Sequence, residues 1–158
     1  MGRKAQIYRQ MAGPRLEKPM FALHPQLAKD CVDLGRLELC RLLLMNDANY
    51  PWFILVPERE DVREVHELAD PDRHQLWEES AQLARALMRG FAPDKLNIAA
   101  LGNQVPQLHV HHIARYRHDP AWPNPVWGRV PAKPYYSAEI DKLRKLLQGL
   151  LDGRLRGT

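Results

Sequence analysis

Two histidines and a glutamine occupy alternate positions near the middle of the sequence, at Gln107, His109 and His111. Apolar residues separate them, as expected for an extended strand. In such a strand, side chains two positions apart share a face and lie roughly 7 Å from one another. A sheet needs a polar row of two imidazoles and an amide only if something binds there. We therefore take this row as the candidate functional site.

The residue types alone leave several uses for this row open. His109 and His111 would make a fair pair of metal ligands, although a zinc site usually takes three or four ligands from the protein. A nucleic-acid surface is a weaker option, because imidazoles carry little charge at neutral pH. Covalent catalysis is a third option, in which a neutral imidazole attacks phosphorus and a second group stabilises the charge that develops. A polar row that simply faces solvent is the fourth.

The neighbouring patterns predict a sheet that would position the row. We predict the histidine-bearing strand over residues 105–116, after a strand at 95–101 and a turn at Gly102 and Asn103. Two apolar runs, at 39–45 and 52–56, lie on either side of a turn-rich segment and suggest an antiparallel pair.

Helical patterns complete the expected fold. Asp70 and Pro71 predict the start of a long helix that ends near residue 90, because apolar residues then recur at helical spacing. A short helix is expected at residues 25–29, and a helix capped by Ser137 is expected over residues 137–151. Together these elements predict an α+β fold, with an antiparallel sheet of about five strands, a long central helix and a C-terminal helix.

The bulk properties are those of an ordinary globular protein. The chain has 158 residues and a formal charge of +4, and contains two cysteines, Cys31 and Cys40, too few for a disulfide framework. We expect a flexible extension over residues 1–19 and one domain over residues 20–158, with a proline-rich segment at 120–134. No apolar run approaches the roughly 20 residues of a membrane helix. We expect a cytoplasmic protein that binds neither membrane nor nucleic acid.

Residues 102–115 read GNQVPQLHVHHIAR and resemble the signature of the histidine triad family, in which three histidines alternate with apolar residues after a polar loop. The order of elements agrees, and the resemblance covers about residues 21–128. It implies a homodimeric, HIT-like enzyme that acts at the α-phosphate of purine nucleotide conjugates through a nucleotidyl-histidine intermediate. Dinucleoside polyphosphates such as diadenosine tetraphosphate, or nucleoside phosphoramidates, would be its substrates. No cofactor is required, although a divalent cation such as Mg²⁺ would help with a polyphosphate.

The resemblance also assigns roles to individual residues. His109 matches the middle histidine, which attacks phosphorus, and His111 matches the third, which contacts the phosphate and orients the nucleophile. Asn103 falls where a polar residue lies near the phosphate or the leaving group. Asn46 falls where an acidic or amide residue binds the ribose hydroxyls, with Asp47 as a possible substitute.

Three positions depart from the family pattern. Gln107 stands where the family has the first histidine of the triad, and we expect its side chain to contact the substrate. An amide cannot titrate near neutrality. Trp52 replaces a further histidine of many relatives, and His112, at an apolar position, is expected to be structural. Trp122 and Trp127 either fill the edge of the core or form a wall for a base or a partner subunit. These departures keep an alternative function open: a sensing or scaffold protein that binds purine nucleotides without significant turnover.

Overall fold

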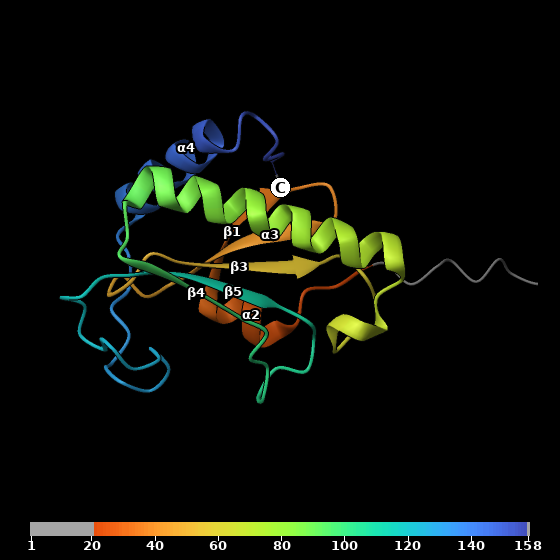
Figure 1. The fold of residues 1–158 in the computed structure, drawn as a ribbon, viewed down its shortest axis with the longest axis horizontal. Helices are drawn as coiled ribbons and strands as arrows, with labels where there is room; N and C mark the ends of the chain where they lie inside the picture. The colour runs from red at the N-terminus through yellow and green to blue at the C-terminus, as the bar shows by residue number, and fades with distance from the viewer. Residues whose placement is uncertain (1–20, 158) are drawn as a thin grey trace, which may run out of the picture.

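Five antiparallel strands form one sheet in the computed structural model, which describes residues 21–157 (Figure 1). The strand order is β1-β2-β3-β5-β4, and every neighbouring pair is antiparallel. The strands are β1 (Cys31–Arg36), β2 (Cys40–Met45), β3 (Trp52–Pro57), β4 (Lys95–Ala99) and β5 (Val110–Arg115). The prediction of an α+β fold built on an antiparallel sheet is confirmed. The extension expected at residues 1–19 lies outside the described residues.

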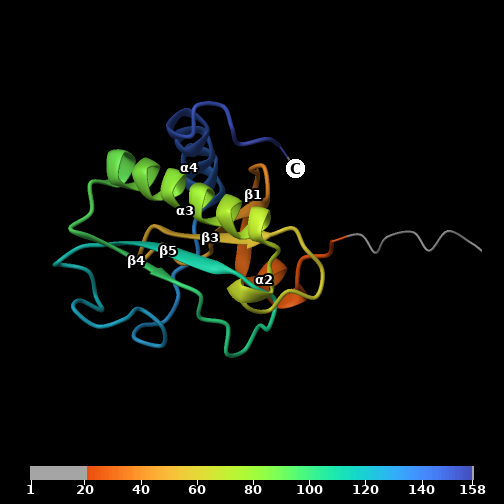
Figure 2. The ribbon, with the colours of Figure 1, turned by 45° about the vertical axis from the view of Figure 1, so that its right-hand side comes forward.

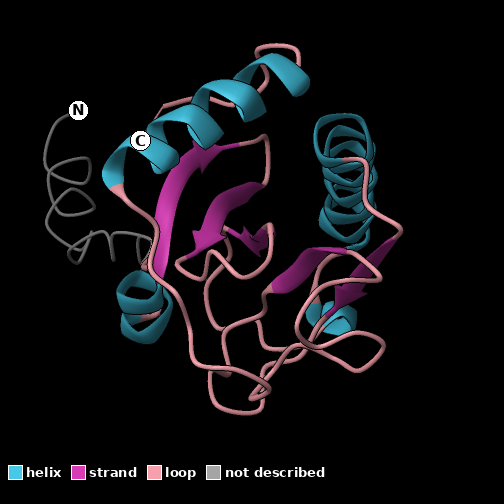
Figure 3. Cartoon of the chain, turned by 90° about the vertical axis from the view of Figure 1, so that its left-hand side faces the viewer, coloured by secondary structure: helices cyan, strands magenta, loops and turns pink. Residues whose placement is uncertain are grey.

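Helices lie on both sides of this sheet. They are α2 (Pro25–Asp30), the short 3₁₀ helix η1 (Val65–Glu67), α3 (Asp70–Phe91) and α4 (Ser137–Leu150). The two long helices, α3 and α4, lie over one face, and α2 lies beyond the other (Figures 1 and 2). Figure 3 shows loops gathered on the side of the sheet away from these two helices. Between residues 21 and 157, no helix is long and apolar enough to cross a membrane.

The long helix begins close to the predicted residue. Ala69 is the N-cap, and Asp70 is the first helical residue instead of the cap. The carboxylate still lies in the first turn, where the helix dipole favours negative charge. The cap predicted at Ser137 also differs by one residue. Tyr136 is the N-cap of α4, and its backbone N–H donates to the Glu139 carboxylate.

Strand alternation divides the core between the two faces of the sheet. On β3, Phe53 and Leu55 pack with apolar residues of α3 and α4, whereas Trp52 and Ile54 pack on the opposite face. Ile54 pairs with His111 across the ladder, and Phe53 pairs with His112. His111 therefore lies on the face where the loops gather, and His112 lies on the face covered by α3.

The histidine-bearing strand is shorter than predicted. β5 begins at Val110, so residues 105–109 do not belong to the ladder. Pro106 has no N–H to donate, and the Leu108 N–H donates to the Val62 carbonyl at 2.9 Å instead of to a strand partner. Residues 105–109 therefore lie outside the sheet, and the chain enters β5 only after His109.

The first strand was not predicted at all. Asp33 and Gly35 are poor strand formers, and the ladder between β1 and β2 shifts register between them. Gly35 has a φ of +134°, and a side chain there would collide with the carbonyl of Arg156 in the C-terminal tail. A bulge occupied by glycine thus lets the tail pack against this edge strand.

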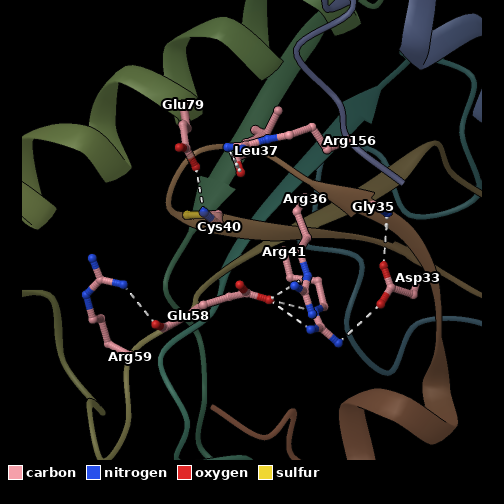
Figure 4. A network of polar contacts seen from close by, with 10 residues as sticks. All are labelled: Asp33, Gly35, Arg36, Leu37, Cys40, Arg41, Glu58, Arg59, Glu79 and Arg156. Carbon is pink, nitrogen blue, oxygen red and sulfur yellow. Dashed lines mark hydrogen bonds and ion pairs between the residues drawn. The ribbon is translucent and has the colours of Figure 1, made fainter. Parts of the chain in front are cut away.

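Ion pairs join the strands at this edge of the sheet (Figure 4). The Arg41 guanidinium on β2 lies 3.3 Å from an Asp33 oxygen on β1 and 2.8 Å from Glu58, just beyond β3. Arg36 also reaches Glu58, at 3.1 Å. Arg41 and Glu58 are only partly exposed, so their pairing is less screened than an ordinary surface pair.

A buried carboxylate attaches the β1–β2 connection to α3. Glu79 is 1% exposed and accepts the backbone N–H groups of Leu39 and Cys40 at 2.7 and 2.9 Å. These bonds satisfy a charge that would be strongly unfavourable if it were buried alone. Burial, followed by the charge of this carboxylate, raises the pKa of the Cys40 thiol, so this cysteine is unreactive.

Candidate functional site

His109 and His111 meet at the wall of one cavity on the loop face of the sheet. His111 belongs to β5, and His109 lies just before the strand. Their ring centroids are 4.9 Å apart at an interplanar angle of 73°. The cavity has a volume of about 380 Å³. Its lining combines α2, the end of β2, and the loops before and after β5: Gln26, Leu27, Asp30, Met45, Leu101, Gly102, Asn103, Gln104, Val105, His109, His111, Trp127 and Gly128.

The hydrogen bonding of His109 fixes its tautomer. Its Nδ1 lies 2.6 Å from the Gln107 carbonyl oxygen, which can only accept, so Nδ1 carries the proton and donates. Nε2 then holds a lone pair, and no hydrogen bond within residues 21–157 engages it. His109 is 5% exposed, and burial lowers its pKa, so the neutral ring predominates at physiological pH. This is the protonation state that a histidine nucleophile requires.

A glycine makes room for this ring. A Cβ at Gly102 would lie 2.7 Å from the Val105 carbonyl oxygen and 3.2 Å from Cε1 of His109. The first distance is shorter than real Cβ contacts allow, so a larger residue would displace the loop. Gly102 therefore permits the loop to pass directly against the nucleophile.

His111 is locked in the opposite tautomer. The Trp52 indole N–H donates to its Nδ1 at 3.0 Å, and an indole nitrogen can only donate. The proton of His111 therefore lies on Nε2, which donates to the Leu101 carbonyl at 3.1 Å. Burial, followed by the proximity of His109, lowers the pKa of His111 to about 4. His111 is thus neutral with both nitrogens occupied, and its expected contact with phosphate stays a prediction.

Tryptophans enclose His111 on its other sides. The ring centroid of Trp127 lies 5.2 Å from His111 and 5.5 Å from Trp52, both nearly edge to face. Such pairs stabilise a fixed arrangement beyond the effect of burial alone. Trp52 stands at the position where the family resemblance led us to expect a further histidine. It orients His111 through a hydrogen bond and a ring contact.

The two tryptophans of the proline-rich segment have different surroundings. Trp127 lines the cavity, whereas Trp122 packs 5.8 Å from the guanidinium of Arg115. Arg115 is 1% exposed and forms an ion pair with Asp119 at 2.7 Å. The same guanidinium donates to the Asn124 carbonyl. Of the two options left open by the sequence, the structure places Trp127 at the cavity and Trp122 in the packing that holds this segment.

A second cavity of about 390 Å³ adjoins the first. The two share Asp30, Met45, Trp127 and Gly128 in their walls. The second also reaches Asn46, which was expected to bind ribose. The Asn46 side-chain oxygen accepts the Tyr135 N–H at 2.9 Å. Asn46 therefore lies on the wall with its acceptor already engaged.

Asp47 is engaged more completely than Asn46. It is 6% exposed, and its Oδ1 accepts N–H groups of Asn49 and Lys133 at 3.1 Å. The Asn49 side-chain amide donates to the same oxygen at 2.7 Å. These bonds give Asp47 a structural role in joining the β2–β3 turn to the segment before α4.

The Gln107 side chain is held by the segment before α2. Its side-chain oxygen accepts the His24 N–H at 2.9 Å, and its amide donates to the Ala22 carbonyl at 2.9 Å. The predicted row of three side chains on one strand is therefore wrong, because β5 begins at Val110 and both Gln107 and His109 precede it. Gln107 and Asn103 line a neighbouring cavity of about 280 Å³ that also touches His109. Asn103, which is exposed, contributes to the first cavity as well.

His112 lies on the opposite face of the sheet, as the alternation requires. It is fully buried, its Nδ1 lies 3.1 Å from the Val110 carbonyl, and its Nε2 lies 2.7 Å from the Ser80 hydroxyl oxygen on α3. The carbonyl can only accept, so Nδ1 donates and Nε2 accepts the hydroxyl proton. Burial lowers the pKa of His112 to about 4. These contacts give His112 a structural role.

Two further findings bear on ligands. Within residues 21–157, no group of three or more histidines, cysteines and acidic residues is arranged to hold a metal ion. Asp30 and Met45 line both large cavities, although the sequence analysis did not single them out. They lie more than 60 positions before His109, and only the fold brings them together with it.

Comparisons with known proteins agree with this geometry. The model of the HIT domain family matches residues 26–118. A histidine triad protein from Marinobacter aquaeolei VT8 is 49% identical, with 85% of this chain and 98% of that chain covered at a TM-score of 0.82. A histidine triad protein from Bradyrhizobium japonicum is 44% identical, with 84% and 99% covered at a TM-score of 0.82. One from Sinorhizobium meliloti 1021 is 43% identical, with 82% and 96% covered at a TM-score of 0.80. No curated protein matches the chain.

Proposed function

The chain belongs to the histidine triad family, and from this membership we propose that it is a nucleotide-binding enzyme that hydrolyses or transfers nucleotidyl groups. Its substrates would be nucleotide conjugates, attacked at the α-phosphate. One observation carries the proposal above the others. His109 is a neutral imidazole at a cavity wall, with Nδ1–H bonded to a carbonyl and the lone pair of Nε2 available.

In the first chemical step, Nε2 of His109 forms a bond to the α-phosphorus while the bond from phosphorus to the leaving group breaks. The leaving group departs with the bonding electron pair. The ring becomes positively charged, and its Nδ1–H donates to the Gln107 carbonyl 2.6 Å away, which stabilises that charge. A water oxygen then bonds to phosphorus as the N–P bond breaks, the water loses a proton to solvent, and a nucleoside 5′-monophosphate and neutral His109 result.

The surroundings of His109 favour one class of leaving group. Both nitrogens of His111 are engaged, and the Gln107 amide does not titrate. Neither can supply the proton that a departing amine needs, whereas a phosphate chain departs as an anion. We therefore expect dinucleoside polyphosphates to be better substrates than phosphoramidates. No cofactor is required, and Mg²⁺ would neutralise charge on the polyphosphate itself.

The cavities suit the remainder of a nucleotide. Trp127 offers a flat apolar surface in both, which fits a purine base. Asn103 is exposed beside His109, where an amide can donate to phosphate oxygens or to the leaving group.

The first experiment compares the wild type with His109→Ala on diadenosine tetraphosphate and on an adenosine phosphoramidate, following the release of AMP. We expect turnover by the wild type and loss of about 10³-fold or more in the variant, as for other covalent nucleophiles. His74→Ala is the matched control, because it removes an exposed histidine on α3. Equal turnover by all three proteins would contradict the proposal.

A second candidate function is nucleotide sensing without turnover. The displaced Gln107 side chain and the occupied nitrogens of His111 favour it, because both leave His109 with less support than a full triad would give. This candidate predicts that the wild type binds AMP tightly and releases none from either substrate.

We further propose that the protein forms a homodimer through β4. This strand lies at the edge of the sheet, where its outer backbone groups are available for pairing. Ile98 on β4 and Trp77 on α3 are large apolar residues that are 43% and 46% exposed. Light scattering would test this arrangement by measuring the molecular mass of the wild type and of Ile98→Lys. A charge at this dimer interface should produce monomers.

A further inference from the structure

An arginine lines the smaller cavity beside the nucleophile. This cavity, of about 280 Å³, has Arg63 and Gln107 in its wall together with His109. The larger cavity that His109 lines, of about 380 Å³, has no lysine or arginine among the described residues of its wall. Among the described residues of these two walls, Arg63 is therefore the one cationic side chain.

The backbone at Arg63 is fixed beside the nucleophile. The Val62 carbonyl accepts the N–H of Leu108, the neighbour of His109, at 2.9 Å. The Arg63 N–H donates to the Glu67 carboxylate at 2.7 Å. These two bonds hold the connection between β3 and α3 against the segment that carries His109.

The Arg63 side chain, in contrast, is available for a ligand. It is exposed, and no hydrogen bond or ion pair within residues 21–157 engages its guanidinium. The arginines before and after it in the sequence are paired, Arg59 with Asp72 at 2.6 Å and Arg73 with Asp70 at 2.6 Å. A planar guanidinium binds phosphate oxygens in a bidentate manner. The arginine that lines the cavity is thus the one whose donors are open to a phosphate.

The two cavities meet at the nucleophile and suit different parts of a substrate. Their walls share Gly102, Asn103, Val105 and His109. The α-phosphorus of a nucleotide conjugate carries the nucleoside and the leaving group as separate substituents, which extend in different directions. The larger cavity contains Trp127, which fits the base. The leaving group then extends into the smaller cavity, toward Arg63.

We infer that Arg63 binds the phosphates of the leaving group and makes the site selective for nucleotides that carry further phosphates beyond the α-phosphate. This inference rests on the proposed function, because it assumes that the α-phosphate lies at His109. As the bond from the α-phosphorus to the leaving oxygen breaks, that oxygen takes the electron pair. The guanidinium stabilises the resulting negative charge and keeps its own protons.

A carboxylate in the same wall opposes this interaction. Glu64 lines the smaller cavity and is exposed. Its negative charge repels a polyphosphate, whereas the charge of Arg63 attracts it. The two neighbours should therefore have opposite effects on the binding of phosphates, which a merely structural role of either residue would not produce.

The first experiment measures the Kd for AMP and for ATP without divalent cations, in the His109→Ala background, which prevents turnover. We expect Arg63→Ala to weaken ATP binding by about 10-fold or more and AMP binding by less than about 3-fold. Arg63→Lys should be intermediate, because it keeps the charge and loses the bidentate geometry. Glu64→Gln should strengthen ATP binding. Arg85→Ala, an exposed arginine on α3 outside both cavities, is the matched control and should leave the ratio of the two Kd values unchanged.

The second experiment measures rates with His109 present. In Arg63→Ala, kcat/KM for diadenosine tetraphosphate should fall by about 10-fold or more, because its leaving group is a phosphate chain. The value for an adenosine phosphoramidate should fall by less than about 3-fold, because its leaving group carries no phosphate.

Two outcomes would overturn the inference. One is an equal loss of AMP and ATP affinity in Arg63→Ala, because Arg63 would then contact the α-phosphate or stabilise the fold. The other is an unchanged ratio of the two Kd values. Either result, together with turnover by the wild type, would refute this inference and leave the proposed function standing. If no protein turns over, the ratio of Kd values still decides whether Arg63 binds the outer phosphates.

Discussion

Acidification should destabilise this protein through two buried histidines. His111 is 3% exposed and His112 is fully buried, and both have a pKa of about 4 in the folded chain. In the unfolded chain each returns to an ordinary pKa of 6.5. Between these two values the unfolded chain binds more protons than the folded chain. The free energy of unfolding therefore falls as the pH drops below about 6.5, and this loss is complete near pH 4.

The size of this effect follows from the shifts. At pH 5, about 1.5 units below the pKa of the unfolded state, each histidine should cost about 2 kcal/mol, at 1.36 kcal/mol per unit. Together the two amount to about 4 kcal/mol, a large part of the 5–15 kcal/mol that stabilises a typical domain. Most carboxylates protonate below pH 5, so the loss between pH 7 and pH 5 reports mainly on histidines.

The contribution of His112 can be isolated by removing both partners of its hydrogen bond. In the double variant Ser80→Ala/His112→Leu, neither a donor nor an acceptor of this pair is left buried, so stability at pH 7 should change by only about 1 kcal/mol. Urea unfolding followed by tryptophan fluorescence at pH 7 and pH 5 should then show a loss on acidification that is about 2 kcal/mol smaller than in the wild type. His74→Leu, at an exposed position on α3, should keep the full loss. A double variant with the same loss as the wild type would refute the reasoning.

Three further predictions follow from the contacts of the site. Trp52→Phe removes the N–H that fixes the tautomer of His111. We therefore expect ¹⁵N NMR to show mixed tautomers of His111 and kcat to fall by about 10-fold. An unchanged tautomer would contradict the assignment. Gln107→Ala removes two hydrogen bonds to the segment before α2, so urea unfolding should report a loss of about 1–2 kcal/mol. We expect kcat to fall by less than about 3-fold, because these hydrogen bonds go to the segment before α2 and not to the His109 ring. A large loss of kcat would argue for a catalytic Gln107. Arg115→Met leaves the Asp119 carboxylate buried without its partner, and a loss of about 3–5 kcal/mol is expected in the same assay; a loss below about 1 kcal/mol would contradict the packing described.

Much of the fold was predictable because its signals are local. The apolar runs of β2 and β3 and the helical spacing of α3 lie at or near the predicted residues. The alternation within β5 correctly separates His111 from His112, because side chains on a strand must alternate between faces. The family signature around His109 pointed to the same region that the cavities occupy.

The side-chain contacts of the candidate site could not be predicted, because they join segments that are distant in the sequence. The bond between Trp52 and His111 joins residues 59 positions apart, and the bond between Gln107 and the His24 N–H spans 83 positions. No local pattern encodes either contact. The place of Asp30 in the cavity is of the same kind, since it follows from how α2 packs beside β2.

The central claim is that His109 becomes covalently attached to a nucleotide during turnover. Mixing the protein with diadenosine tetraphosphate, stopping the reaction within milliseconds to seconds under alkaline conditions and measuring the intact mass would test this directly. We expect an increase of one adenylyl group, located by peptide mapping to the segment that contains His109 and absent from His109→Ala. Turnover with no adduct at any time point, or an adduct that persists in His109→Ala, would contradict the claim.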